Sequence, residues 1–403
     1  MQLKKNSPKP PKDEIIYSIS AKEYSEMSDN ERAMWSPVKA KYEKIPLFCK
    51  ISLIVGALCA IIYAIICASE SFADFFNTHI STAFRFLFAK TTNILPFSLA
   101  ELIIISLPII AFISIWYLLK FRCDTKRSSM VSIVCIFSIL SLFLSSFVLC
   151  FAAGYQGTPL DKKLNIESQA VGADDLYKTS EYLVNKINEL SAEIGYGEDD
   201  FSAMPYSFKE MNKKLLEAYD SFCEEHDFIS TFNSRLKPVL LSEAMSYAHI
   251  TGIYSFFTGE TNINVNFPDY TIPFTAAHEM AHQRGFARED EANMIAFLVC
   301  IESSDPYIQY SAYLNVFEYV ASALYRADNK KFKQIYNELN AYTYHEQKAY
   351  NAFFEKYDNS VASQVSGVVN DTYLKTQGTV GKKSYGMVVD LTVAYLKSQN
   401  YIE

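Results

Sequence analysis

The sequence predicts a mainly α-helical protein, with three transmembrane helices followed by a helical extracytoplasmic domain that contains a small β-hairpin or sheet. Three observations lead to this prediction. Long apolar runs fall between residues 47 and 153, apolar residues recur at three- and four-residue steps over most of the remainder, and one short segment alternates polar with apolar residues. These patterns are typical of membrane spans, amphipathic helices and a half-buried strand, respectively.

The apolar runs divide the chain into three parts. We predict a cytoplasmic N-terminal segment over residues 1–46, a membrane domain over 47–153 and an extracytoplasmic domain over 154–403. The predicted spans cover about residues 47–68, 97–119 and 130–153. Each run has the length of about 20 mostly apolar residues that a helix needs to cross a bilayer.

Positive charges predict the orientation of these spans in the cell membrane. Residues 1–46 include nine Lys or Arg, and the short loop 120–127 includes four, whereas the loop 69–96 includes only two. Cytoplasmic loops carry the excess of Lys and Arg, so we expect a cytoplasmic N-terminus and a C-terminal domain outside. The loop 69–96 also spaces Phe and Leu at helical intervals, which favours an amphipathic helix along the outer surface of the lipid bilayer.

Composition excludes several classes of site. The net charge is −8 and no basic stripe occurs outside the membrane flanks, so we expect no nucleic-acid partner. Six of the eight cysteines lie in or beside the apolar third, where a free Cys behaves as a small apolar residue. No CxxC pair occurs, which argues against a disulfide scaffold and a cysteine-ligated zinc site. Whether Cys223 and Cys300 pair stays open.

Residues 154–403 follow a mostly helical pattern. Apolar residues recur at helical steps over 176–194 and 208–226, and again over 308–327, 332–357 and 385–399. We therefore expect helices to form the bulk of this domain.

One segment of the same domain predicts a strand. Asparagine alternates with an apolar residue throughout TNINVNF (261–267), at Asn262, Asn264 and Asn266. Such alternation is typical of a half-buried strand with one polar face. The preceding GIYSFFT (252–258) is the expected hairpin partner, with Gly259 and Glu260 in the turn.

A motif of potential ligands follows this strand. HEMAH places His278 and His282 one helical turn apart, with Glu279 between them. Residues i and i+4 share a helix face, so both imidazoles can reach a single metal ion. Zinc accepts neutral histidine nitrogens, and a catalytic zinc site leaves one position to water. Glu279 can take a proton from that water and pass it to a leaving amine, which predicts a hydrolytic site with one Zn²⁺ per chain.

A catalytic zinc site needs a third protein ligand. The HExxH helix is expected to end near Gly285, whose backbone suits a left-handed cap, and a second helix to start near Arg288. The first turn of this second helix carries three acids, Glu289, Asp290 and Glu291. Because the chain reverses at the glycine, each of them can swing back toward the histidines.

Among these acids we favour Glu289, with Glu291 as the runner-up ahead of Asp290. Glu289 shares a helix face with Ala292 and Asn293. Ala292 is small enough for close helix packing, and the amide of Asn293 can hydrogen-bond a ligating histidine. The residues by themselves leave the choice open.

The order of strand, HExxH helix and second helix bearing Glu289-Asp290-Glu291-Ala292-Asn293 resembles the gluzincin zinc metallopeptidases, which include membrane-embedded prenyl-protein proteases and bacterial relatives. The first Glu of their ExxA[DN] motif is the third zinc ligand, so the resemblance implies this role for Glu289 and a zincin-like outer domain. FTGETNINVNFPDYTIPFTAAHEMAHQRGFAREDEAN and NDTYLKTQGTVGKKSYGMVVDL look like an uncharacterised family, a domain of unknown function of bacterial multi-spanning membrane proteins. This likeness runs from the first span onward and implies no substrate.

The chain departs from two zinc-peptidase patterns. The gap between His282 and Glu289 is shorter than gluzincins usually show. Gly285 fits the HExxHxxGxxH pattern of metzincins, but Arg288 stands where their third histidine belongs, and arginine does not ligate zinc. We therefore do not expect a metzincin site.

The resemblance also implies a substrate-binding strand and a transition-state donor. In such peptidases an edge strand beside the active-site helix binds the substrate backbone by β-augmentation. TNINVNF is the candidate strand, with Asn262, Asn264 and Asn266 lining the cleft, and a plain two-stranded sheet is the alternative. Tyr373 and Tyr385, in the C-terminal stretch, are candidate donors to the developing oxyanion.

These observations predict a membrane-anchored zinc metallopeptidase that hydrolyses peptide bonds of a peptide or protein substrate. His278, His282 and Glu289 hold the metal, and Glu279 acts as base and then as acid. The alternative is a non-catalytic membrane protein whose zinc site is structural and whose outer domain binds a protein or cell-wall partner. Glu279 counts against this alternative, because a structural zinc site needs no base.

Overall fold

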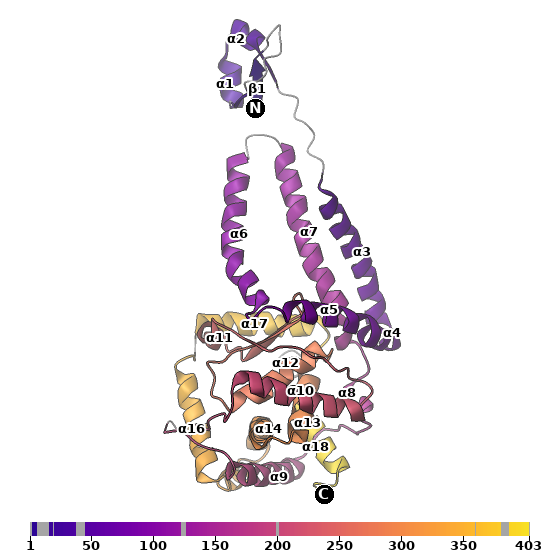
Figure 1. Ribbon diagram of the computed structural model, residues 1–403, viewed down its shortest axis with the longest axis vertical. Helices are drawn as coiled ribbons and strands as arrows, with labels where there is room; N and C mark the ends of the chain where they lie inside the picture. Colours follow the sequence, from indigo (N-terminus) through magenta and orange to yellow (C-terminus); the bar gives the residue numbers. More distant parts are fainter. Residues whose placement is uncertain are drawn as a thin grey trace. The chain divides into compact units, whose positions relative to one another are not determined.

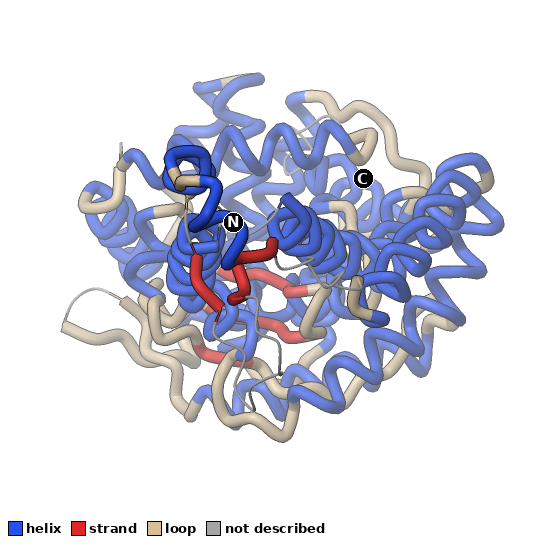
Figure 2. The backbone as a smooth tube through the Cα atoms, turned by 90° about the horizontal axis from the view of Figure 1, so that it is seen from above, coloured by secondary structure: helices blue, strands red, loops and turns tan. Residues whose placement is uncertain are grey.

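The computed structural model describes residues 2–5, 16–18, 20–37, 45–121, 126–198, 201–358, 360–379 and 387–402. They fall into two compact units, a small unit made of Met1–Ala60 and Leu102–Ser145 and a large unit made of Ile61–Glu101 and Ser146–Glu403. The fold is mainly α-helical, as predicted, and its strands are few and short (Figures 1 and 2).

The described residues before the first span contain a sheet that the sequence analysis does not predict. Strands β1 (Gln2–Lys5), β2 (Ile16–Ser18) and β3 (Trp35–Pro37) pair antiparallel in the order β2-β1-β3. The short helices α1 (Ala21–Glu26) and α2 (Asp29–Met34) connect β2 to β3. Strands of three or four residues are too short to show the alternation by which a strand is recognised in a sequence.

Three helices are long and apolar enough to cross a membrane, as predicted. They are α3 (Leu47–Ala68), α6 (Leu99–Phe121) and α7 (Lys126–Cys150). The third helix ends before the predicted boundary at residue 153, because the chain turns into the 3₁₀ helix η2 (Ala152–Tyr155). Helices of this length and composition are those of a membrane protein.

The segment between the first two spans is helical, as predicted, and belongs to the large unit. It consists of α4 (Glu70–Phe75), the π-helical turn η1 (Phe76–Ser81) and α5 (Thr82–Thr92). Arg85 of α5 is buried, and its guanidinium donates to the carbonyl oxygen of Cys150 at 2.9 Å and to the side chain of Asn77 at 2.8 Å. This arginine therefore joins the segment of α4, η1 and α5, which we call the connector, to the end of α7.

The remaining helices make up most of the large unit (Figure 1). They are α8 (Leu160–Lys163), α9 (Ala173–Ser191), α10 (Phe208–Glu225), α11 (Ser242–Tyr247), α12 (Thr271–Gln283), α13 (Glu289–Glu302), α14 (Pro306–Ala327), α15 (Asn329–Tyr336), α16 (Ala341–Glu355), α17 (Val361–Thr376) and α18 (Val388–Ser398). The single helix predicted over 332–357 is divided into α15 and α16. Asn340 causes the break, because its side chain accepts from the N–H of Thr343 and caps α16.

The sheet of the large unit has three strands, β4 (Lys237–Pro238), β5 (Gly252–Ser255) and β6 (Glu260–Ile263), in the order β4-β6-β5. β5 and β6 form the predicted antiparallel hairpin. The two-stranded alternative is wrong, because β4 pairs parallel with β6 on its other side. β6 is therefore the central strand and β5 an edge strand, which reverses the expectation that TNINVNF forms the edge.

Glu260 is the first residue of β6 and does not lie in the turn, contrary to the prediction. Its carboxylate accepts from the N–H groups of Leu99 and Ala100 at 3.0 and 2.8 Å, in the first turn of α6. The first N–H groups of a helix have no partner within the helix, and a carboxylate both satisfies them and complements the helix dipole. The sheet is thereby fixed to the start of the second span.

Helices α12 and α13 form the centre of the large unit. Every residue of α12 except His278 is buried, and α13 is buried from Glu291 to Cys300. A helix without a polar face must be covered on all sides. α12 accordingly packs against α13, α14 and both strands of the hairpin. The HExxH segment thus lies in the core of the unit, where its geometry is fixed by packing.

We expect Arg85→Ala to lower the unfolding temperature of the protein, because the acceptors on Cys150 and Asn77 lose their donor inside the fold. Removing a buried, charged hydrogen-bond donor costs about 3 kcal/mol. Lys90→Ala changes an exposed residue of the same helix and serves as the control, with an expected effect under about 0.5 kcal/mol. Circular dichroism in detergent measures both, and equal unfolding temperatures would contradict the role of Arg85.

Candidate metal centre

The HExxH helix is held by side chains from distant parts of the chain. The hydroxyl of Tyr219 on α10 donates to the carbonyl oxygen of Ala277 at 2.6 Å. Gln283 donates at 2.7 Å to the carbonyl oxygen of Gly259 in the hairpin turn. The buried guanidinium of Arg284 lies 3.8 Å from the centre of the Tyr219 ring. These contacts fix the rotation of α12, and with it the direction of both histidines.

The chain reverses between α12 and α13 at Gly285, as predicted. Gly285 has φ +103°, and a Cβ there would lie 2.7 Å from side-chain atoms of Asn77 and Arg85. Asn77 also donates to the Gly285 carbonyl oxygen at 3.0 Å. A Cβ on Gly154 would come within 2.4 Å of the same oxygen. Two glycines therefore permit a close backbone approach, after which α13 starts directly behind Arg288.

This reversal brings the two histidines and Glu289 together. Oε2 of Glu289 lies 3.2 Å from Nε2 of His278 and 3.5 Å from Nε2 of His282. One ligand atom from each residue lies within 4.8 Å of the other two, a spacing that can hold a metal ion. The three side chains come from one face of α12 and the first turn of α13.

The second nitrogen of His282 fixes its tautomer. Nδ1 lies 2.6 Å from the carbonyl oxygen of Phe286 and donates its proton there, so Nε2 is the nitrogen that faces Glu289 and that could bind a metal ion. Metal-binding histidines commonly donate their other N–H to a carbonyl or carboxylate in this way.

Charges in the metal-free protein are coupled between His282 and Glu289. Burial lowers the pKa of His282, but the carboxylate of Glu289 outweighs burial and raises that pKa to about 9. Burial likewise raises the pKa of Glu289, but the two histidines outweigh it and hold the pKa well below its usual value. At neutral pH the pair therefore keeps a proton at the place where a cation would bind.

Glu279 lies between α12 and the edge strand β5. The N–H of Tyr254 donates to its carboxylate, and burial raises its pKa against the opposing influence of the histidines. Oε2 of Glu279 has no hydrogen-bond partner among the described residues. A Cβ at Gly252 would lie 2.8 Å from Oε1, so only glycine at this position lets the carboxylate lie so close to the strand. A carboxylate with a raised pKa beside a metal site is suited to accept a proton and release it again.

The other two acids of α13 do not join the cluster. Glu291, the runner-up, accepts from the N–H of Leu160 at 2.9 Å and pairs with Arg288 at 3.3 Å. Burial raises its pKa to about 7, against the lowering influence of Arg288. Asp290 is not in the group of ligand atoms that the structure brings together. Of the three candidates, only Glu289 is brought to the histidines.

Asn293 does not make the hydrogen bond expected of it. Its amide nitrogen has no partner among the described residues, and neither does Nδ1 of His278. Both residues line the same cavity, together with Tyr319 of α14. Asn293 is therefore a neighbour of the cluster but not a support for a ligating histidine, because the turn carbonyl of Phe286 already fills that role for His282.

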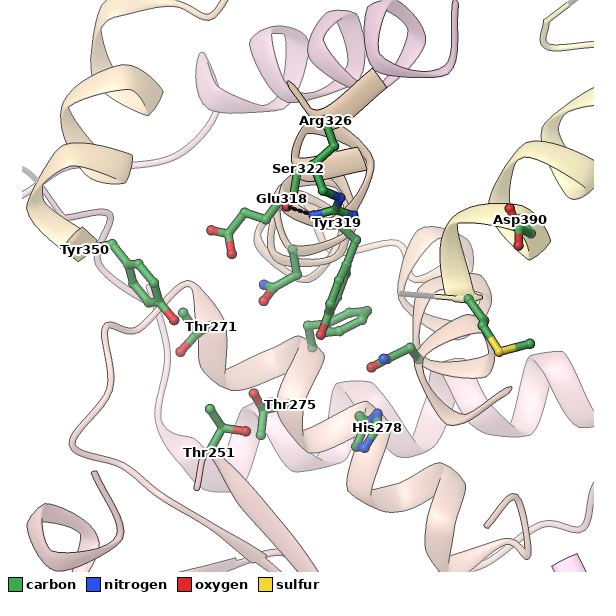
Figure 3. A pocket seen from close by; sticks show the side chains of 14 residues that line it. Thr251, Thr271, Thr275, His278, Glu318, Tyr319, Ser322, Arg326, Tyr350 and Asp390 are labelled. Atoms are coloured by element: carbon green, nitrogen blue, oxygen red, sulfur yellow. Dashed lines mark hydrogen bonds between the residues drawn. The ribbon is translucent and has the colours of Figure 1, made fainter. Parts of the chain in front are cut away.

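Two cavities share His278 and Thr251 in their walls. The cavity of about 690 Å³, which we call the apolar cavity, also includes His282, Glu289, Glu279 and several aromatic side chains, among them Phe151 and Phe256. The cavity of about 860 Å³, the polar cavity, contains Glu318, Arg326 and Asp390 among its lining residues (Figure 3). Figure 3 shows His278 projecting from its helix at one end of the polar cavity. The cluster can thus be reached from open space.

The predicted role of the three asparagines of TNINVNF is not supported, because their amides bind inside the protein. Asn262 donates to Ser255 at 3.0 Å, and Asn264 and Asn266 donate to Ser246 at 3.0 Å each. None of the three lines either cavity that includes His278. The strand beside the cluster is instead β5, from which Gly252, Ile253 and Tyr254 line the apolar cavity. The alternation in TNINVNF therefore marks amides that hydrogen-bond to hydroxyls of the protein, and two of the three, those of Asn262 and Asn264, are buried.

Several tyrosines and a second histidine-bearing segment contribute to the walls of the two cavities. Tyr373, a predicted donor, lines the apolar cavity and accepts a hydrogen bond of 3.2 Å from Tyr155. Tyr385, the other predicted donor, lies outside the described residues. Tyr155, Tyr319 and His249 also line the two cavities, and the sequence does not identify them. No local pattern marks them, because only the fold brings them to the histidines.

The residues present fit a zinc ion. Two imidazole nitrogens and one carboxylate oxygen are the ligand types that zinc takes in catalytic sites, and they converge at the wall of an open cavity. Among the described residues, Glu225, His226 and Glu302 form a second group of suitable spacing, but at the surface, where acidic groups commonly gather without an ion. Cys223 and Cys300 are both free.

Comparison with known proteins finds one family whose model matches most of the chain. Residues 73–393 match the model of a family described as "Protein of unknown function (DUF3810)". The match includes the whole metal cluster and confirms the expected likeness to an uncharacterised family, although it begins after the first span. No curated protein and no solved structure matches the chain.

We expect Glu289→Gln to abolish stoichiometric zinc binding and Glu291→Gln to leave it intact. Both changes replace a carboxyl group in the first turn of α13 by an amide of the same size, so they form a matched pair. The difference arises because only Glu289 reaches both histidines. Metal analysis of the purified variants after dialysis measures the zinc content. Equal zinc contents in the two variants would disprove the ligand assignment.

Zinc affinity should rise with pH as His282 loses its proton. With a pKa of about 9 in the metal-free protein, Nε2 must release a proton before it can bind a metal. We therefore expect the dissociation constant for zinc to fall about tenfold per pH unit from about pH 7 to 8.5. Competition with a fluorescent chelator, corrected for the protonation of the chelator, measures the slope. A flat profile over this range would show that His282 is already neutral.

Proposed function

Because the chain belongs to the family DUF3810, whose description names no activity, we propose its function from the geometry of the site: it is a membrane-anchored, zinc-dependent metallopeptidase. The observation that carries the proposal is the convergence of His278, His282 and Glu289 within 4.8 Å at the wall of a cavity that Glu279 also lines. The resemblance of the motif order to gluzincins supports the same chemistry.

The chemistry of the proposal is hydrolysis of a peptide bond. His278, His282 and Glu289 would hold a zinc ion, which would lower the pKa of a water molecule to about 7 and act as a Lewis acid toward the scissile carbonyl. Glu279 accepts the proton of the attacking water and passes it to the leaving amine, a role that suits its raised pKa. Oε2 of Glu279 has no hydrogen-bond partner among the described residues and is available for this proton.

Tyr373 is our candidate donor to the developing oxyanion. Its hydroxyl accepts from Tyr155, which leaves its own proton available to donate. Burial raises the pKa of Tyr373, so the hydroxyl keeps this proton at neutral pH. A donor of this kind in a site that excludes water stabilises the transition state.

The edge strand β5 is our candidate for binding the substrate backbone. Gly252, Ile253 and Tyr254 line the cavity that includes the cluster, and β5 pairs with β6 on one side only. An extended peptide can add to such an edge as a further strand. We further propose, from the distribution of Lys and Arg, that the large unit lies outside the cytoplasm, so that cleavage takes place at the outer face of the cell membrane.

We expect Glu279→Gln to keep one zinc per chain and to reduce cleavage by at least about a thousandfold, since the change removes the proton acceptor but no ligand. Glu217→Gln, an exposed change on α10, is the control. Cleavage of a fluorogenic peptide pool and metal analysis of the same preparations test both. If Glu279→Gln behaves like Glu217→Gln in a zinc-loaded protein that cuts peptides, the base is another group. If native protein holds zinc and cuts no peptide, the structural-zinc alternative is favoured.

A further inference from the structure

Helix α17 carries a row of exposed valines, which we call the valine stripe. It consists of Val361, Val365, Val368 and Val369, with exposed fractions of 77, 57, 68 and 62%. The spacing places all four on one face of the helix. A contiguous apolar surface of this kind on a folded protein marks a contact with a partner or a membrane.

The C-terminal end of α17 is joined to the span ends that belong to the large unit. The hydroxyl of Tyr63 on α3 donates to Gln377, just past the end of α17, at 3.3 Å. The ring of Phe147 on α7 packs edge-on against Tyr373 with a centroid distance of 6.2 Å. Because these contacts lie near the ends of two membrane spans, the C-terminal end of α17 lies beside the span ends that belong to the large unit.

Neighbouring elements extend the apolar surface around the span ends. Leu240 and Leu241 are 84 and 50% exposed, and their N–H groups donate to Glu101 in the first turn of α6 at 3.1 and 2.8 Å. On α5, Phe86 and Leu87 are 47 and 53% exposed. Figure 1 shows α5, α11 and α17 along the side of the large unit from which its span ends emerge. The occupant that fits an apolar surface around the span ends of the large unit is the lipid bilayer itself.

The adjoining face of α17 forms a wall of the apolar cavity. Ser366, Asn370 and Tyr373 line this cavity together with His278, and Val369 both lines it and is exposed. Ile253 of the edge strand, 45% exposed, belongs to the same wall. One helix therefore presents valines on its outer face and the metal cavity on its inner face.

We propose that the valine stripe rests on the surface of the lipid bilayer, and that the metal site acts on polypeptide segments that adjoin a membrane anchor. The substrate class rests on the peptidase function proposed above. A chain that leaves the bilayer at α17 passes through the apolar cavity, reaches His278 and continues into the polar cavity, which contains Glu318, Arg326 and Asp390. This order of environments matches a peptide that is apolar next to its anchor and polar beyond it.

Tryptophan quenching tests the membrane contact without any need for activity. The chain has two tryptophans, so Trp35→Phe and Trp116→Phe provide a silent background. In this background Val365→Trp reports on the stripe, and Tyr325→Trp, at a 54% exposed position of α14, is the matched control. The full chain is reconstituted in vesicles of phosphatidylcholine and phosphatidylglycerol with brominated or ordinary acyl chains. We expect brominated lipid to quench Val365→Trp at least about twofold and Tyr325→Trp hardly at all. Equal quenching at the two positions, or none at Val365→Trp, would overturn the membrane contact.

A pair of substrates tests the class of peptide. One fluorogenic peptide pool is supplied free and, in parallel, coupled to phosphatidylethanolamine in the same vesicles. We expect native protein to cut the coupled pool at least about tenfold faster, because the membrane contact raises its effective concentration at the site. The double variant Val365→Glu/Val368→Glu, at positions outside both cavities, should lose this advantage and keep its zinc content and its rate on the free pool.

The two proposals fail in different ways. Equal cleavage of the free and coupled pools by native protein would overturn the substrate class and leave the peptidase function standing. A double variant that keeps the full advantage of the coupled pool would overturn the role of the stripe in substrate choice. If native protein holds no zinc and cuts neither pool, the peptidase function and the substrate class are both wrong. The quenching result would still decide the membrane contact.

Discussion

The candidate metal site of His278, His282 and Glu289 depends on one backbone reversal, the turn at Gly285. The left-handed backbone of this glycine, and the contact of its carbonyl oxygen with Gly154, let α13 start close enough to α12 for Glu289 to face both histidines. Asn77 and Arg85 occupy the space that a side chain at 285 would need. The cluster is thus a product of packing between the connector, the end of the third span and the turn, as well as of the HExxH sequence.

Burial of the ligands has an energetic consequence. Charged groups inside a protein are costly unless they are paired, and α12 with α13 holds His278, His282, Glu279 and Glu289 in one place. The carboxylate of Glu289 and a proton on His282 compensate each other in the metal-free protein, which explains the opposite directions of their pKa shifts. A divalent cation bound at this place would replace that proton and take all three side chains as ligands. The fold thus holds the three side chains at a spacing that suits a metal ion.

The sequence predicts features that depend on local chemistry, and fails where distant elements meet. Composition alone predicts the three spans. Gly285 and the acids after Arg288 predict the two helices of the site and the turn between them. The sequence places the edge strand in the wrong segment. β4 decides that β6 lies in the middle of the sheet, but its two residues are too few to show the alternation of a strand. Tyr155, Tyr319 and His249 come from separate elements, so no spacing in the sequence could connect them with His278.

The closure of the turn by Asn77 and Arg85 also sets an order of assembly. These residues belong to the connector after the first span, and Gly154 follows the third, so every piece that shapes the turn is synthesised before α12. A fragment that starts at residue 154 would lack Asn77 and Arg85, whose side chains occupy the space beside Gly285. The shape of the turn that carries the candidate ligands therefore depends on residues next to the membrane spans, and we expect the two parts to fold together.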